Sequence, residues 1–379
     1  MKKFRIIFII CLIVVGSYLA GKLIIDNQSE EVRGNISIWA NEDSYDYLNE
    51  ASKLFIESNE KCSIDVSLVY RKNYKDKILS DSENLPNIIQ LSTNTYKSIV
   101  DNGEFKNYIS EERTIVENYS SNFSKGRLKE VDDKNKIIGV PLTSRPLALY
   151  LREDMLSEYG YTHEDINTWD DLKRVGEDIL EKSSGKIKIL NAVGQDYEDL
   201  VSLLVMQAME ESDDRVKIEE FVSTNLSALS NIMNTSKNGE FLARISSINS
   251  MKELSALDVF CEWTANNAPA KSNGANRFYV AEGDNLLVLN ESEENSDLIK
   301  KFIGFLATNT EETVKYVKEG RFFSSYLSVY KNISIEDEVK NFKGKSPLVV
   351  MSNIYEKAPK IENYTMYLEM KNKMLSQWG

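Results

Sequence analysis

The 379-residue sequence contains very little histidine and cysteine. His163 is its one histidine, in the polar stretch Tyr-Thr-His-Glu-Asp, and no Cys-x-x-Cys pair occurs. Zinc sites and histidine-based catalytic triads need several such residues close together. The sequence therefore predicts no metal, no cofactor and no catalytic residue.

Cysteine is also scarce, with only Cys11, Cys62 and Cys261 present. Cys62 and Cys261 are far apart in the sequence, and we expect them in different halves of the molecule. Two free, partly buried thiols are the favoured interpretation. One disulfide between them is the alternative if this part of the chain is exported.

The chain has fewer positive than negative side chains. It contains 46 lysine and arginine residues and 59 aspartate and glutamate residues, which gives a net charge of −13. Nucleic-acid binding requires clustered lysine and arginine, so this charge argues against it. A solubilising acidic surface is the simpler interpretation. Hydrophobic residues make up 42% of the chain, enough for large buried cores. The length predicts two or more domains.

An apolar run extends from Ile6 to Ile25, behind Lys2, Lys3 and Arg5. A basic flank before about 20 apolar residues is typical of a membrane segment that leaves the rest of the chain outside the cell. We expect an uncleaved anchor, with a cleaved signal peptide as the second interpretation. The polar stretch Asp26–Asn35 then serves as a tether.

Strand-like and helix-like patterns alternate after this tether. Ile36–Trp39 alternates as a strand does, and Tyr45–Ser58 carries apolar residues on one helical face. Thr168 is a good N-cap for a helix over Trp169–Glu181, with Asp171 three residues on. Further strands are predicted over residues 62–70, 85–91, 186–190, 257–263, 277–281 and 286–289, and further helices over 72–80, 95–102, 197–209, 218–235, 239–250, 297–307, 311–319, 349–358 and 364–378. This alternation predicts an α/β fold with helices on both faces of a parallel or mixed sheet.

Several blocks occur in an order that resembles the sugar-type, maltose-binding-like extracellular solute-binding proteins of bacterial ABC importers. Gly139–Pro141 followed by Ala148–Tyr150 resembles the family's Gly-Val-Pro and Ala-Leu-Tyr blocks. Thr168–Leu172 reads Thr-Trp-Asp-Asp-Leu, similar to the usual Thr-Trp-Asp-Glu-Leu, and Pro86–Ile89 resembles a Pro-Asp-Ile-Ile strand. The resemblance covers nearly the whole chain after Gly34. The family's Gly-x-Trp strand is degenerate here, which weakens the assignment to sugars.

The resemblance implies a two-lobed, type II periplasmic-binding-protein-like clamp with three interlobe crossings, near residues 143–146, 283–286 and 321–326. It implies a first lobe from residues 35–143 and 286–323, a second lobe from 144–285 and 324–379, and an anchor or signal segment with tether over 1–34. The implied function is capture of a small molecule, a sugar or oligosaccharide, by hinge closure. A monomer would then dock on ABC permease subunits at the extracellular face of the cell membrane.

Family positions imply ten ligand-binding residues, namely Trp39, Glu42, Ser92, Asn94, Arg145, Tyr150, Trp263, Glu282, Asp284 and Tyr364. Trp39 and Trp263 are candidates for stacking on sugar rings, with core packing as the alternative. Arg145, inside the first crossing, either forms an interlobe salt bridge, the favoured interpretation, or clamps a carboxylate or phosphate. Tyr150 fits a cleft position and a sheet position equally well.

Two rival functions stay open. A polysaccharide hydrolase needs two carboxylates at a fixed separation, and no motif singles out such a pair, so we expect no enzyme. A membrane-anchored sensor or scaffold domain would keep the clamp fold without serving transport. The degenerate strand that ends at Trp263 favours this second rival.

Overall fold

The computed structural model describes residues 32–81, 84–100, 113–133, 136–289 and 293–378. The predicted membrane segment and most of the tether lie outside these ranges. Within them, no helix combines the length and the apolar character needed to cross a membrane.

Lobe 1 is built on a five-stranded sheet in the order β2-β1-β3-β14-β6. Its strands are β1 (Gly34–Ala40), β2 (Cys62–Leu68), β3 (Ile88–Ser92), β6 (Val140–Pro141) and β14 (Asp284–Val288). β1 pairs in parallel with β2 and β3, whereas β14 runs antiparallel to β3 and β6. The C-terminal ends of β1, β2 and β3 therefore lie at one edge of the sheet.

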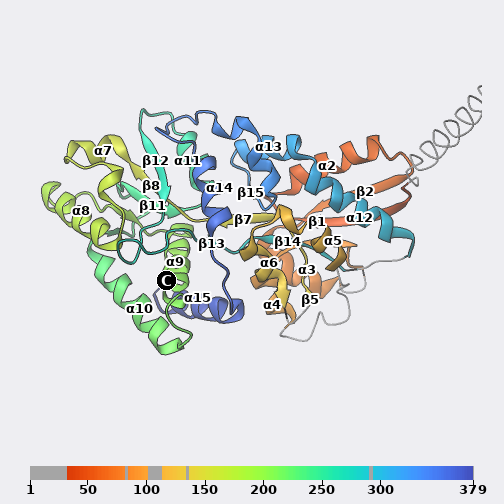
Figure 1. Ribbon diagram of the computed structural model, residues 1–379, viewed down its shortest axis with the longest axis horizontal. Coiled ribbons are helices and arrows are strands. Elements are labelled where there is room, and N and C mark those ends of the chain that lie inside the picture. The colour runs from red at the N-terminus through yellow and green to blue at the C-terminus, as the bar shows by residue number, and fades with distance from the viewer. Residues whose placement is uncertain (1–31, 82–83, 101–112, 134–135, 290–292, 379) are drawn as a thin grey trace, which may run out of the picture.

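Helices cover both faces of this sheet (Figure 1). α2 (Tyr45–Glu57), α12 (Glu293–Thr308) and α13 (Thr310–Lys318) pack on one face, and α3 (Tyr74–Ser80) and α4 (Thr93–Val100) on the other. The alternation of a strand sends Ile36 and Ile38 into the first core and Trp39 into the second. The lobe also contains α5 (Arg113–Asn118), α6 (Lys125–Val131), β4 (Asp132–Asp133) and β5 (Lys136–Ile137).

Lobe 2 has its own five-stranded sheet, in the order β10-β9-β11-β8-β12. The strands are β8 (Ala148–Arg152), β9 (Leu190–Asn191), β10 (Met233–Asn234), β11 (Ala243–Ser246) and β12 (Trp263–Asn267). The helices of this lobe are α7 (Glu153–Glu158), α8 (Trp169–Lys182), α9 (Gln195–Met209), α10 (Arg215–Leu229), α11 (Ile248–Ser255), α14 (Pro347–Lys357) and α15 (Tyr364–Trp378). α14 packs against both β12 and the strand that joins the lobes, so it buttresses the junction.

The start of α8 confirms the predicted N-cap. The backbone N–H of Asp171 donates to Thr168 Oγ1 over 3.1 Å, and the N–H of Thr168 donates to the Asp171 carboxylate over 3.0 Å. Trp169 is buried, and its indole N–H donates to Gln207 Oε1 over 2.7 Å. This capping box fixes where α8 begins.

The three predicted crossings lie side by side in a small sheet between the lobes, in the order β13-β7-β15. β7 (Thr143–Pro146) is the central strand; Arg145 pairs with Ala281 of β13 (Val280–Ala281), and Ser144 pairs with Phe323 of β15 (Phe323–Ser324). The two-lobed α/β clamp with three crossings is therefore confirmed (Figure 1). The residue boundaries of the two lobes stay a prediction.

Several predicted elements differ from the structure. The strand predicted over 186–190 is a strand only at Leu190, where β9 begins, and the helix predicted over 218–235 ends at Leu229, because Met233–Asn234 pairs with β9 as β10. Residues 239–250 form no continuous helix, because Ala243–Ser246 is the strand β11, and α11 begins only at Ile248. β11 lies between β8 and β9 with Ala243 and Ile245 fully buried, so sheet pairing overrides the local helical pattern. Residues 257–262 form no strand, since β12 begins at Trp263. Cys62 and Cys261 are buried free thiols, which confirms the favoured interpretation of the cysteines.

At Gly283 the second crossing passes directly against the first. A Cβ atom there would overlap the carbonyl oxygen of Thr143 and lie 2.9 Å from Cα of Ser144. Because both neighbours are backbone atoms of the central hinge strand, neither can rotate away. Glycine is thus required by the close approach of two chain segments.

We expect Gly283→Ala to lower the free energy of unfolding by about 3 kcal/mol, because the added methyl group forces the two hinge strands apart. The measurement is urea unfolding followed by circular dichroism. Gly126→Ala in α6 is the control, since a Cβ there meets Pro359 O at an ordinary 3.4 Å. Equal stabilities of the two variants would contradict the prediction.

Candidate functional site

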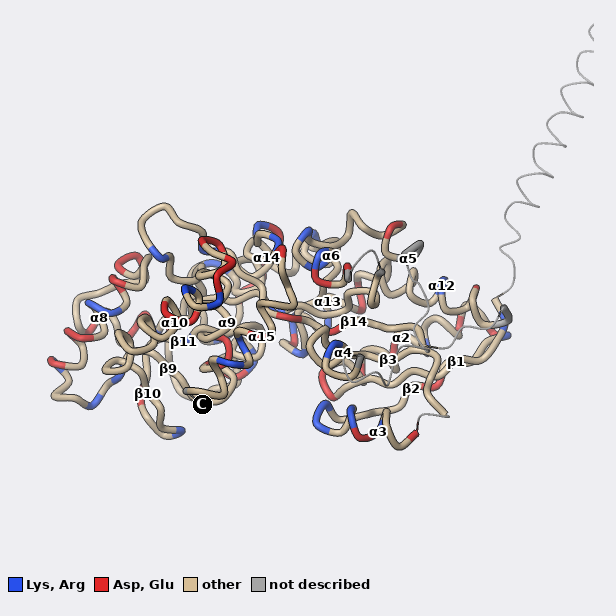
Figure 2. Tube along the Cα trace, turned by 90° about the horizontal axis from the view of Figure 1, so that it is seen from below, with Lys and Arg blue, Asp and Glu red and all other residues tan. Residues whose placement is uncertain are grey.

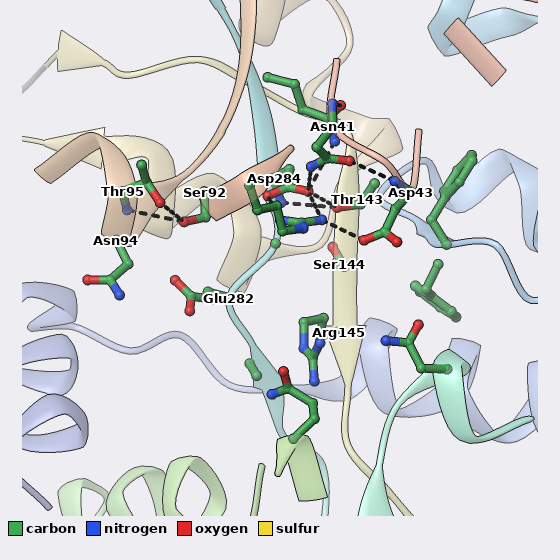
Figure 3. A pocket seen from close by; sticks show the side chains of 18 of the residues that line it. Asn41, Asp43, Ser92, Asn94, Thr95, Thr143, Ser144, Arg145, Glu282 and Asp284 are labelled. Carbon is green, nitrogen blue, oxygen red and sulfur yellow. Dashed lines mark hydrogen bonds and ion pairs between the residues drawn. The ribbon is translucent and has the colours of Figure 1, made fainter. Parts of the chain in front are cut away.

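A cavity of about 330 Å³ lies between the lobes, beside the hinge strands. Its lobe 1 wall comes from the C-terminal ends of parallel strands: Asn41 follows β1, Ser92 ends β3, and Asn94 and Thr95 lie in the first turn of α4 (Figure 3). Parallel strands bring their carboxyl ends to one edge, where the chain leaves the sheet in loops. Segments far apart in the sequence are thereby brought to one wall.

The lobe 2 wall is made by the starts of two helices, the middle of a third, and the crossings. Gln195, Glu198 and Asp199 come from the first turns of α9, Asn249 from the start of α11, and Lys371 from the middle of α15. The crossings contribute Thr143, Ser144, Arg145, Glu282, Gly283, Asp284, Arg321, Phe322 and Phe323. The cavity thus contacts both lobes and every crossing.

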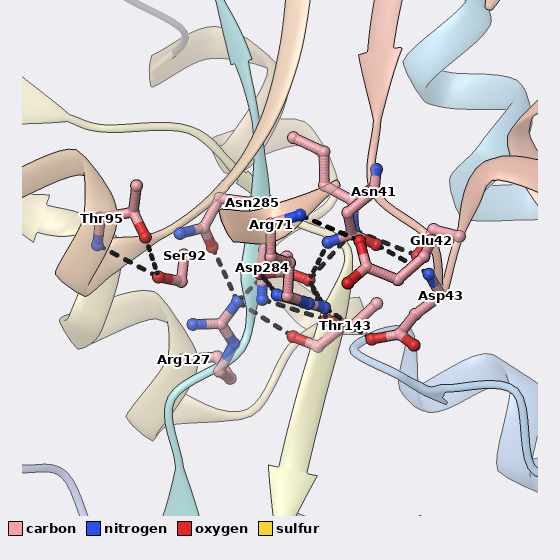
Figure 4. Close-up of polar contacts among 12 residues, drawn as sticks. Asn41, Glu42, Asp43, Arg71, Ser92, Thr95, Arg127, Thr143, Asp284 and Asn285 are labelled. Atoms are coloured by element: carbon pink, nitrogen blue, oxygen red, sulfur yellow. Dashed lines mark hydrogen bonds and ion pairs between the residues drawn. The ribbon is translucent and has the colours of Figure 1, made fainter. Parts of the chain in front are cut away.

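The Asp284 carboxylate organises the lobe 1 side of the cavity (Figure 4). Arg71 donates to its two oxygens over 2.8 and 2.7 Å, and Asn41 Nδ2 and Gln90 Nε2 donate over 2.8 and 3.0 Å. The N–H of Asp284 itself donates to Thr143 Oγ1 over 3.0 Å. Burial raises the pKa of Asp284, but Arg71 and the other donors outweigh burial and hold that pKa below its usual value.

The Arg71 guanidinium is shared between two carboxylates. Besides its bidentate pair with Asp284, Nη2 donates to Asp43 over 2.7 Å, and its backbone N–H donates to Glu42 Oε2 over 3.0 Å. Tyr74 also lines the cavity, is 2% exposed, and its hydroxyl finds no partner among the described residues. Burial raises the Tyr74 pKa, so the phenol stays neutral and offers a hydrogen-bond donor.

On the lobe 2 side, Arg145 reaches from β7 to α9. Its Nη2 donates to both oxygens of Asp199, over 2.6 and 2.8 Å. Asp199 is 1% exposed, and burial raises its pKa against the opposing effect of Arg145. Gln195 also donates to this carboxylate over 3.1 Å. Arg145 therefore forms a salt bridge, but it runs from the hinge strand to a helix of lobe 2 and not from one lobe to the other, as the favoured interpretation had it.

Glu282 and Lys371 form a third ion pair in the cavity lining. Lys371 Nζ donates to Glu282 Oε1 over 3.0 Å. Burial lowers the pKa of Lys371, but Glu282 outweighs that effect and raises it, so the amine stays charged. Glu282 Oε2 is buried and has no hydrogen-bond partner among the described residues. One strong acceptor of a cavity-lining residue is therefore buried without a donor.

Behind the cavity, the buried Arg127 joins two of the crossings. Its Nη2 donates to the carbonyl oxygens of Thr143 and Asp284 over 3.1 Å each, and to Asn285 Oδ1 over 2.7 Å. Glu130 neutralises its charge and accepts from Thr93 Oγ1 over 2.7 Å. Arg127 therefore holds the start of β7 and the start of β14 together.

Five of the ten predicted ligand residues line the cavity. They are Ser92, Asn94, Arg145, Glu282 and Asp284. Two of these, Arg145 and Asp284, form ion pairs with neighbouring side chains of the protein. Ligand contact by any of the five stays a prediction.

The other five lie outside the cavity lining. Trp39 is packed in the core under α3, with Lys77 Nζ 4.6 Å from its ring centre, and Glu42 is exposed. Tyr150 is fully buried, with its hydroxyl donating to Ser247 O over 3.0 Å. Trp263 pairs with Arg152, at the end of β8 away from the hinge. Tyr364 begins α15 and is buried against Tyr367.

Sequence reasoning missed several lining residues. Asn41, Asp43 and Arg71 follow the C-terminal ends of β1 and β2, a position that favours a binding role in parallel sheets. The strand pattern alone could have singled out these three. Lys371 lies on a helix near the end of the chain, and no local pattern distinguishes it from other lysines.

Comparisons with known proteins point to one fold. No protein-family model matches the chain, and no curated protein sequence matches it significantly. Among solved structures, the cyclic alpha-maltosyl-1,6-maltose binding protein from Arthrobacter globiformis matches with a TM-score of 0.71 at 16% identity, over 91% of this chain and 94% of that one. The sugar-binding protein MalE from Xanthomonas citri matches with a TM-score of 0.68 at 15% identity, over 91% and 93%. The chain has the fold of the sugar-type solute-binding proteins.

This solute-binding fold recurs in a third match, the binding protein RafE in complex with raffinose. Its TM-score is 0.60 at 14% identity, over 91% of this chain and 95% of that one. All three matched proteins are named for binding, not for catalysis. The resemblance in the sequence is thus confirmed at the level of fold, while the ligand of this chain has to be argued from its own cavity.

We expect Asp284→Asn to lower the free energy of unfolding by about 3 kcal/mol at pH 7, because Arg71 loses a buried counter-charge. The folded-state pKa of Asp284 is depressed, so the wild type has this stabilisation in full above the usual carboxyl pKa and loses it as the pH falls. The stability difference between wild type and variant should therefore shrink below about pH 4. Urea unfolding between pH 7 and pH 3 measures it.

The control is Asp81→Asn, since Asp81 forms an exposed pair with Lys77 on α3. An exposed pair of this kind contributes less than about 1 kcal/mol. The prediction is contradicted if Asp284→Asn costs no more than this control, or if its cost is the same at pH 3 as at pH 7.

Proposed function

We propose that this protein is the solute-capture subunit of an ABC importer and binds a sugar or oligosaccharide between its two lobes. The observation that carries the proposal is the cavity lining: neutral hydroxyl and amide groups face it from both sides, while each cation is held by a carboxylate. Ser92, Asn94 and Thr95 lie on one side, and Gln195 and Asn249 on the other. Such groups donate and accept hydrogen bonds, as sugar hydroxyls require.

Ligand contact with both lobes gives a reason for closure. Only the closed form lets a ligand reach Asn94 and Asn249 together, so binding shifts the population toward that form. The closed form then docks on permease subunits at the extracellular side of the membrane, as a monomer. The N-terminal apolar segment would keep it near them. Lysine and arginine alternate with aspartate and glutamate along the described part of both lobes (Figure 2), and the net charge of −13 argues against nucleic acid as a partner.

One observation favours a sensor or scaffold as the second candidate. Trp39, Trp169 and Trp263 are all buried outside the cavity lining, so none offers a flat face to a sugar ring. The aromatic residues that do line it, Tyr74, Phe322 and Phe323, are each at most 4% exposed. A sensor with this fold would show no binding of free sugars, or would bind a partner other than a permease.

We expect a sugar ligand to raise the melting temperature of the protein, because it binds the folded state only. The panel contains maltose, larger malto-oligosaccharides, raffinose and their constituent monosaccharides. For the sugar that binds, Asn94→Ala and Asn249→Ala should each weaken the affinity about three- to tenfold, the effect of one lost hydrogen bond.

Asn225→Ala is the matched control, since Asn225 lies on α10 and its side chain donates to Phe221 O within that helix. It should leave the affinity unchanged. If no sugar shifts the melting temperature, transport of sugars is refuted and the sensor is favoured. If only one of the two cavity variants weakens binding, the ligand does not bridge the lobes.

A further inference from the structure

The cavity distributes its charges unevenly. Its lining includes four cations, Arg71, Arg145, Arg321 and Lys371, and each has a carboxylate partner. Arg321 pairs with Asp46, which lies outside the lining. An anionic ligand would have to displace one of these partners, so the cavity disfavours carboxylates and phosphates.

Not all carboxylate oxygens of the same lining have a hydrogen-bond or ion-pair partner. Five line the cavity, namely Asp43, Glu198, Asp199, Glu282 and Asp284. Glu198 is exposed and forms no ion pair within the described residues; its one hydrogen bond, from Gln195 Nε2, is long at 3.5 Å. One carboxylate oxygen of Glu282 accepts a hydrogen bond from Lys371, and the other is buried without a partner. The lining therefore carries an excess of acceptor capacity and of negative charge.

These two carboxylates lie near the same ion pair. Glu198 directly precedes Asp199, the partner of Arg145, and the charge of Glu282 acts on Arg145 as well. Glu282 stands in the cavity close to Asn94 in the view of Figure 3. A buried carboxylate oxygen without a donor costs free energy, and a charged donor compensates it better than a neutral one.

We propose that the ligand of this cavity carries a protonated amine, as an amino sugar does, and that Glu282 and Glu198 receive the amine. This inference rests on the proposed capture of a sugar and names its class. The sugar hydroxyls contact the neutral groups of both lobes, and the ammonium donates to Oε2 of Glu282, the oxygen that lacks a donor. Lys371 positions Glu282 by holding its other oxygen. The net charge of −13 also attracts a cation toward the cleft.

The test compares each sugar with its own charged derivatives. Glucose, galactose and mannose, as monosaccharides and as 1,4-linked disaccharides, are titrated beside their 2-amino and uronic-acid forms by calorimetry. The full chain is used, in a detergent without a sugar headgroup. We expect the amino form of one sugar to bind about tenfold more tightly than its parent, since charged hydrogen bonds are stronger than neutral ones. The uronic acid should bind most weakly.

Two variants test whether Glu198 and Glu282 cause the preference for the amino sugar. Glu198→Gln and Glu282→Gln should each lower the affinity for the amino sugar about tenfold, and by more than they lower the affinity for the parent sugar, so that the preference for the amino form shrinks. Glu198 is exposed, so its variant stays informative even if Glu282→Gln disturbs folding through Lys371. Glu262→Gln is the control, because Glu262 lies outside this cavity and pairs with Lys343.

The outcomes separate this inference from the proposed function. If a parent sugar binds as tightly as its amino form, or a uronic acid binds well, the proposal that the ligand carries an amine is refuted. The proposed capture of a sugar is not affected by that result. An amine preference that survives both glutamine variants overturns the assignment to Glu198 and Glu282. If no form of any sugar binds, both the amine and sugar capture are refuted.

Discussion

The hydrogen bonds to the Asp284 carboxylate hold together the wall of the cleft on which the other polar groups depend. This one side chain accepts from Arg71 after β2, Asn41 after β1 and Gln90 within β3, and it begins β14 itself. A buried carboxylate is stable only when its oxygens are satisfied, and here donors from three neighbouring strands satisfy them. The same bonds align the strand ends and neutralise Arg71. The shape of this wall and the neutralisation of Arg71 thus have one cause.

A second buried ion pair ties two of the crossings together behind the cavity. Arg127 donates to backbone carbonyls at the starts of both β7 and β14, and Glu130 compensates its charge. Gly283 lets these segments lie in contact, because no Cβ comes between them. The starts of β7 and β14 are therefore held in one arrangement by a side chain of α6.

The sequence predicted element types well where the signal is local. The N-cap of α8 and the exact span of α15 follow from capping chemistry and helical periodicity, both of which act within a few residues. Prediction failed at residues 239–250, where pairing with β8 and β9 decides the conformation. It also failed to distinguish the faces of β1. Trp39 and Ile38 are neighbours in sequence, yet they enter opposite cores, and neither reaches the cavity.

By itself, the sequence determined the α/β class, the order of most elements and the scarcity of histidine and cysteine, whereas the three crossings were implied only by the family resemblance. Those properties depend on composition and on patterns within a few residues. Only the tertiary structure decided which charged side chains form ion pairs in the cleft, and that Oε2 of Glu282 has no donor. Arg71 and Asp284 are 213 residues apart, and Lys371 reaches Glu282 across 89 residues. Such pairs are set by how sheets and helices pack in space, and no local pattern records which lysine or arginine will neutralise which carboxylate.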